Sequence, residues 1–78
     1  MMATMSAAEP MMYQAVLYDD SFNRREYVAR VLMMVCYLSE PEANAVMMRA
    51  NRRGGALIDT FEEPVALHIV AGLTKAGL

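Results

Sequence analysis

Residues 39–55 constrain the fold most, because they carry the start and the stop signals of a single helix. Ser39 is a favourable N-cap residue, and Pro41 fits the first helical turn, where its missing N–H costs nothing. The acidic residues at 40 and 42 stand at the positive end of the helix dipole. The glycine pair at 54–55 ends the helix. The segments on either side must therefore form separate elements.

Two strand candidates and two more helices surround this helix. Residues 13–18 and 56–60 are short and rich in strand-favouring side chains. Residues 24–36 repeat apolar side chains at steps of three and four, with Asn23 as the expected N-cap and Glu26 as its capping-box partner. Residues 65–76 form a third helix before Gly77. The predicted order is strand, helix, helix, strand, helix.

This order predicts an α+β fold, in which three helices pack on one face of a short antiparallel sheet within a small single domain. Two strands alone make a weak sheet. Residues 76–78 resemble the approach to a final strand that is largely missing. Residues 1–12 show no periodic pattern, so we expect a flexible N-terminal arm there and a core domain over residues 13–78.

Composition excludes several classes of protein. A chain of 78 residues holds one domain, and 56% hydrophobic residues predict a packed core. The net charge of −2 argues against nucleic-acid binding, and no apolar run reaches the roughly 18 residues of a membrane span. Residues 1–12 lack the pattern of a secretory signal. The lone Cys36 cannot form an internal disulfide, which favours a reducing compartment.

A catalytic set is not apparent. The single histidine, His68, lies in an apolar stretch and is interpreted as a partly buried helix residue. It has no second histidine or cysteine at metal-ligand spacing, so a metal site is not expected. Cys36 lies in an apolar run and is interpreted as a packing residue. The sequence therefore predicts a protein that is not an enzyme.

The pair Asp19-Asp20, between the first strand and the first helix, has two interpretations. It is either a solvated turn or a binding site for a cation. An α-amino group fits the second interpretation, since its pKa of about 7.7–8.0 leaves it charged at neutral pH. The methionine pairs at 33–34 and 47–48 either line an adaptable apolar cavity beside the carboxylates or belong to the ordinary core.

Several stretches resemble the ClpS family: residues 17–28 and 31–32, then 38–43 and 46–47, and finally Gly54 and Ala56. Residues 23–28 look most like its plastid members. The resemblance runs over residues 13–78. It implies an N-degron adaptor that binds proteins starting with Phe, Tyr, Trp or Leu. The adaptor delivers these proteins to a Clp AAA+ unfoldase and protease, without metal or cofactor, in the bacterial cytoplasm or the plastid stroma.

The resemblance also assigns residues to roles. The amine-binding positions of the family correspond to Asp19, Asp20 and Asn51, of which Asp19 replaces an asparagine and Asn51 a histidine. The walls of the hydrophobic pocket correspond to Asn23, Arg25, Val28, Met47 and Ala50.

Two further positions are less typical of the family. The unfoldase-docking Glu and Lys of the family correspond to Pro64 and Ile69. These departures keep open an alternative, in which the chain is a diverged interaction domain that keeps the ClpS fold but has lost recognition of N-terminal residues.

Overall fold

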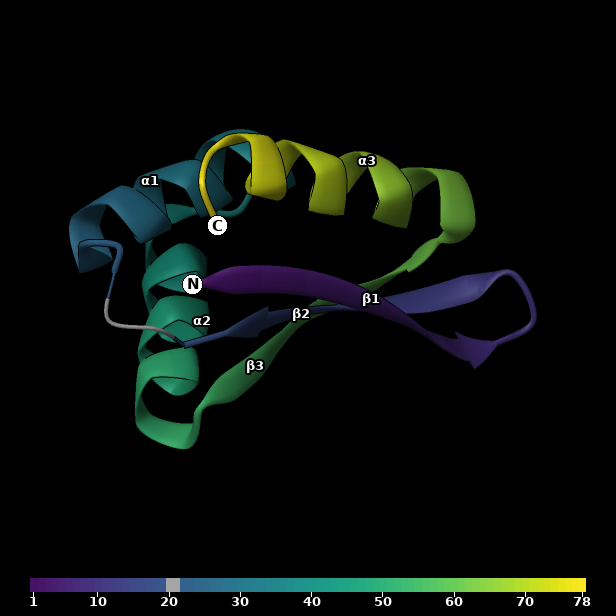
Figure 1. Cartoon of the computed structure of the whole chain (residues 1–78), viewed down its shortest axis with the longest axis horizontal. Coiled ribbons are helices and arrows are strands. Elements are labelled where there is room, and N and C mark those ends of the chain that lie inside the picture. Colours follow the sequence, from purple (N-terminus) through teal and green to yellow (C-terminus); the bar gives the residue numbers. More distant parts are fainter. Residues whose placement is uncertain (20–21) are drawn as a thin grey trace.

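The computed structural model describes residues 1–19 and 22–78, which form three strands and three helices (Figure 1). In chain order the elements are β1 (Met2–Glu9), β2 (Met12–Tyr18), α1 (Arg25–Cys36), α2 (Glu40–Arg53), β3 (Gly55–Glu62) and α3 (Glu63–Lys75). From β2 onward this is the predicted order, and the α+β class is confirmed. The strand β1 was not predicted.

The sheet is antiparallel throughout, with β2 in the centre between β1 and β3. Strand β1 pairs with β2 as a hairpin, so that Met2 lies across from Tyr18 and Ala7 across from Tyr13. Strand β3 pairs along the other edge of β2, with Gly55 across from Tyr18. Three strands with a buried face form a more stable sheet than the two that the sequence suggested.

The expected flexible arm over residues 1–12 is therefore wrong. Pro10 and Met11 make a tight turn, with Met11 at φ 67°, and residues 2–9 fold back along β2. Pairing with β2 satisfies the backbone hydrogen-bonding groups, and Met1 and Ala3 are buried. The sheet thus obtains its third strand from residues that precede β2, whereas the resemblance implied a strand after the third helix.

The helices lie on one side of the sheet (Figure 1). Helix α3 runs over the face of all three strands, α2 packs across the end of the sheet on β2 and β3, and α1 packs on α2 and α3. The largest side chains that are completely buried come from β2, α1 and α3: Leu17, Val28, Val31, Leu32 and Leu73. The core therefore joins the sheet to the helices that border the candidate site.

The ends of α2 match their prediction. The Ser39 hydroxyl accepts a hydrogen bond from the backbone N–H of Glu42 at 3.2 Å, and the Glu42 carboxylate accepts one from the Ser39 backbone N–H at 2.9 Å. This is a complete capping box. At the other end, Gly54 adopts a φ of 85°, which favours glycine, and its N–H donates to the carbonyl of Ala50.

The start of α1 differs from its prediction. The N-cap is Arg24 rather than Asn23, and no side chain caps the helix. The Asn23 side chain accepts a hydrogen bond from the N-terminal ammonium of Met1 instead, at 2.6 Å. A contact with the start of the chain has replaced the local capping bond.

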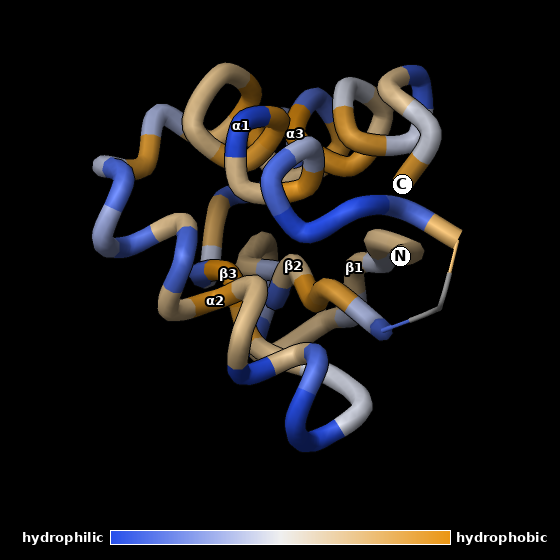
Figure 2. The backbone as a smooth tube through the Cα atoms, turned by 90° about the vertical axis from the view of Figure 1, so that its left-hand side faces the viewer, coloured by the Kyte–Doolittle hydropathy of each residue, from blue (hydrophilic) through white to orange (hydrophobic). Residues whose placement is uncertain are grey.

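The two chain ends meet at this end of the domain. Met1 and Leu78 are both buried and belong to the same apolar core (Figures 1 and 2). Across the described residues, none of the helices has the length and apolar character needed to span a bilayer.

Candidate functional site

Two of the candidate amine-binding residues, Asp19 and Asn51, lie where the end of β2 and the end of α2 come together. Asp19 follows β2 directly and is half-buried. Its backbone N–H donates to the carbonyl of Gly54 at 3.0 Å. This bond ties the end of the strand to the residue that ends α2, and so fixes Asp19 relative to that helix.

Three of the predicted site residues form a hydrogen-bonded chain. The guanidinium of Arg25 donates through Nη2 to Oδ1 of Asn51 at 3.0 Å. The amide of Asn51 donates through Nδ2 to Oδ1 of Asp19 at 3.5 Å. The Asn51 oxygen, which we expected to accept from an amine, already accepts from Arg25. Asp20, the third predicted amine ligand, lies outside the described residues.

This series of hydrogen bonds orients the Asp19 carboxylate, and within residues 1–19 and 22–78 no ion pair neutralises it. One Asp19 oxygen receives the Asn51 amide, which leaves further lone pairs for a cation. Arg25 is exposed, so its charge is largely solvated, and its side-chain stem borders the site. The arrangement can accept hydrogen bonds from an ammonium group.

Three more of the predicted pocket residues belong to the apolar core. Val28 on α1 and Met47 and Ala50 on α2 are all buried in one core cluster. Met1 and Ala3, contributed by β1, belong to the same cluster. The sequence interpretation missed these two residues because it assigned no structure to residues 1–12. Pro10, a turn-favouring residue between two stretches rich in apolar residues, was the available signal for a hairpin.

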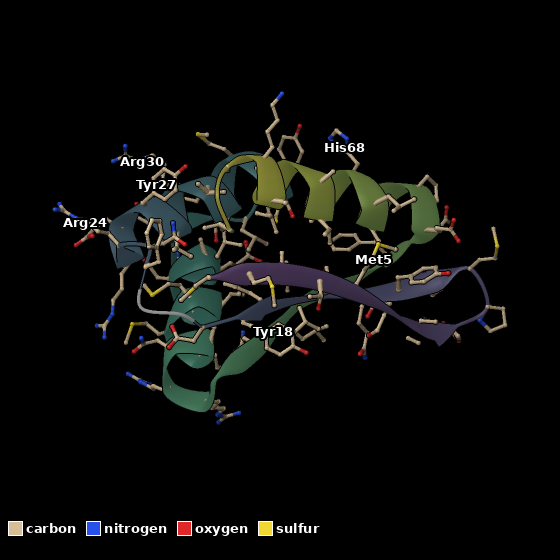
Figure 3. All side chains as sticks on the ribbon, viewed as in Figure 1. Met5, Tyr18, Arg24, Tyr27, Arg30 and His68 are labelled. Atoms are coloured by element: carbon tan, nitrogen blue, oxygen red, sulfur yellow. The ribbon has the colours of Figure 1, made fainter. Side chains whose placement is uncertain are left out.

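Two surface hollows lie outside this set. One, of about 380 Å³, lies between α1 and α2 and is lined by Glu26, Ala29, Arg30, Met33, Glu40 and Asn44. The other, of about 360 Å³, is lined by Arg24, Glu26, Tyr27 and Arg30 on the outer side of α1 (Figure 3). Both are shallow and carry charged rims, so neither resembles an apolar pocket for a side chain.

The other reactive side chains take no part in the hydrogen bonds that join Asp19, Asn51 and Arg25. His68 is exposed on the outer side of α3, where we had expected partial burial (Figure 3). Cys36 is half-buried at the end of α1, and burial raises the pKa of its thiol to about 11. The thiol is therefore protonated at neutral pH, which agrees with a packing role. Of the methionine pairs, Met47 is core, whereas Met33 and Met34 are exposed.

Comparison with known proteins identifies the family. The sequence model for "ATP-dependent Clp protease adaptor protein ClpS" matches residues 8–77. The chain belongs to the ClpS family. Most of β1 precedes the stretch that matches the family model.

The similar proteins come from bacteria and from a chloroplast. The chain is 37% identical over 68 residues to the "ATP-dependent Clp protease adapter protein ClpS 2" of Mesorhizobium japonicum, covering 87% of this chain and 67% of that protein. It is 32% identical over 74 residues to the chloroplastic CLPS1 of Chlamydomonas reinhardtii, covering 94% of this chain and 46% of that one.

A solved ClpS structure has the same fold. Agrobacterium tumefaciens ClpS2, solved with bound L-phenylalaninamide, aligns with a TM-score of 0.83 and 33% identity, covering 88% of this chain and 83% of that one. The fold expected from the resemblance is thus confirmed by comparison. The description of the family as adaptors, rather than proteases, agrees with a protein that acts by binding.

Proposed function

We propose that this chain is an N-degron adaptor. It binds the α-amino group and the bulky hydrophobic side chain of a substrate's first residue, and delivers the substrate to a Clp AAA+ unfoldase and protease. The observation that carries the proposal is the half-buried Asp19 carboxylate, which accepts a hydrogen bond from Asn51. The family resemblance assigns the buried residues Val28 and Met47 to the apolar wall of the pocket. Phenylalaninamide, the ligand of the Agrobacterium relative, combines an α-amine with an aromatic side chain.

Each group in the site has a role in this proposal. The Asp19 carboxylate, together with Asp20, accepts charge-assisted hydrogen bonds from the substrate ammonium, which is protonated at neutral pH. Asn51 holds Asp19 in place and is itself held by Arg25. Asn23, Val28, Met47 and Ala50 border the first side chain. Small Ala50 and the stem of Arg25 favour the flat rings of Phe, Tyr and Trp over Leu.

Docking to the unfoldase uses a surface that differs from the family pattern. Of the two family docking positions, Pro64 is exposed at the start of α3, whereas Ile69 is buried in the core. A buried isoleucine offers no charge to a partner, so the contact must rely on exposed residues near Pro64. Exposed neighbours include Val65 and Leu67. The bacterial and chloroplastic relatives favour the bacterial cytoplasm or the plastid stroma as the compartment.

The test is a titration of fluorescent peptides that differ only at the first residue. A Phe-first peptide should bind, and the same peptide with an acetylated α-amine should bind at least tenfold more weakly, because a charge-assisted hydrogen bond is worth roughly 1.5–3 kcal/mol. The substitution Asp19→Asn should weaken binding of the Phe-first peptide. Asp59→Asn, which removes an exposed carboxylate on β3, is the matched control and should not.

Equal affinity for the amine and acetylated peptides would refute the adaptor proposal. That result would favour the diverged interaction domain, which predicts no dependence on the amine.

A further inference from the structure

The start of the chain lies at the proposed amine site. Because Met2 pairs with Tyr18, continuing the β1–β2 register by one residue brings Met1 across from Asp19. Figure 2 shows the N-terminus between the end of β2 and the segment that leads into α1. The ammonium of Met1 donates to Oδ1 of Asn23 at 2.6 Å, in a partly buried setting.

The side chain of Met1 is buried as deeply as the pocket wall. Only 4% of the residue is exposed, and it belongs to the same core cluster as Val28, Met47 and Ala50. These three wall residues are almost completely covered as well. The apolar wall that would receive a guest's side chain is therefore covered in this structure, and Met1 belongs to the same buried cluster.

Met1 has the chemistry of the ligand that the site is proposed to take. It presents an α-ammonium and a long apolar side chain on one residue, and the thioether adapts to irregular cavities. By contrast, Met2, the next residue, is 57% exposed. Ala3 is buried again at 6%, so the exposure alternates as it does along a strand, and Met1 and Ala3 both face the core.

We propose that, in this 78-residue chain, Met1 occupies the place of a substrate's first residue, so that a substrate must displace it. The inference rests on the proposed adaptor function. Occupation by the chain's own residue reduces the apparent affinity for peptides by the fraction of molecules in which the site is open.

Chains released from a cleavable N-terminal fusion allow the first residue to be chosen. Three versions test the proposal: the parent, Met1→Ala, and a chain with Gly-Ser added before Met1. Met1→Ala keeps the ammonium and removes the side chain, while the extension moves the ammonium away from Asn23. If nine in ten parent molecules are closed, each change should tighten binding of a Phe-first peptide up to about tenfold. Met2→Ala is the matched control and should leave the affinity unchanged.

A second measurement does not depend on the variants. With methyl-labelled methionine, the Met1 methyl resonance of the parent should move to a solvent-exposed position when phenylalaninamide is added. If Met1 is instead a permanent wall, its resonance keeps a buried position during binding, and Met1→Ala weakens affinity; either result overturns the proposal.

The two proposals fail in different ways. Equal binding of the Phe-first peptide by all three chains, with an acetylated control that does not bind, refutes occupation by Met1 and leaves the adaptor function intact. Absence of amine-dependent binding in every version refutes the adaptor function, and occupation by Met1 with it.

Discussion

Helix α2 begins at the capping box of Ser39 and ends at Gly54, whereas α1 begins at Arg24 without a side-chain cap and ends at Tyr37 in the left-handed region. The two helices pack on each other and are similar in length, with 14 and 12 residues. Helix α2 has local signals at both ends. Helix α1 lacks such a signal at either end. Its position depends on buried side chains and on hydrogen bonds between residues far apart in sequence. One example is the bond from the Tyr27 hydroxyl to the carbonyl of Ala76 at 2.6 Å.

The contrast shows how the site is held. Residues of α2 that face the site, such as Asn51, are carried by a helix with strong local determinants. Residues at the start of α1, such as Asn23 and Arg25, take their positions from contacts with other parts of the chain. A change in those contacts should move the α1 side of the site and leave the α2 side in place.

The largest effect is expected from a substitution that removes tertiary packing from α1. Leu32 is completely buried, and Leu32→Ala should lower the free energy of unfolding by about 3 kcal/mol, through lost burial and the cavity left behind. Ser39→Ala, which removes the local cap of α2, should cost only about 1 kcal/mol. Urea denaturation measures both values. The contrast between the two helices would be wrong if Leu32→Ala lowered the free energy of unfolding by no more than Ser39→Ala does.

A smaller effect is expected from substitutions at the C-terminal ends of the two helices. Gly54 and Tyr37 both have positive φ, at 85° and 57°, and Tyr37 is 86% exposed. Gly54→Ala should destabilise the domain by about 1 kcal/mol, because a Cβ is strained in this region. Tyr37→Gly should stabilise it by roughly half that amount, since relief of strain exceeds the entropy cost of glycine. Thermal unfolding should show opposite shifts in Tm, and shifts of the same sign would contradict the argument.

The smallest effect concerns pH and the capping box. Hydrogen bonds from the backbone and side chain of Ser39 lower the pKa of the Glu42 carboxyl below its usual value of 4.5. A group with a lowered pKa in the folded state stabilises the fold above its unfolded pKa and loses that contribution as pH falls through the folded pKa. The parent should therefore lose slightly more stability than Glu42→Gln between neutral pH and about pH 3. Identical pH profiles for the two proteins would exclude a contribution from this carboxylate.

Prediction from the sequence succeeded where the residues that set the ends of a helix lie close to one another in the sequence. Ser39, Glu42 and Gly54 give α2 correct ends, because capping bonds join residues close in sequence. It failed at β1, since residues 2–9 mix small and apolar side chains without a clear period and become a strand only through pairing with β2. It also failed at Asn23, a good cap whose side chain bonds the Met1 ammonium instead.

The candidate site was reached mainly through the family resemblance. That resemblance named Asp19, Arg25 and Asn51 separately, but the bonds that join them depend on the meeting of β2, α1 and α2 in space. The bond from Arg25 to Asn51 in particular crosses 26 positions of sequence, a distance at which residue patterns carry no geometric information.

The origin of β1 also determines the order in which the sheet can assemble. β1 meets β2 across a turn of two residues, Pro10 and Met11, whereas β3 reaches β2 only after two helices have been placed. A hairpin of this kind forms in roughly 1–10 μs, and its loop-closure entropy is small. One edge of the central strand can therefore be paired before the helices dock. A strand placed after α3 would have required closure of a loop containing almost the whole domain, so the arrangement lowers the contact order of the fold and favours faster folding.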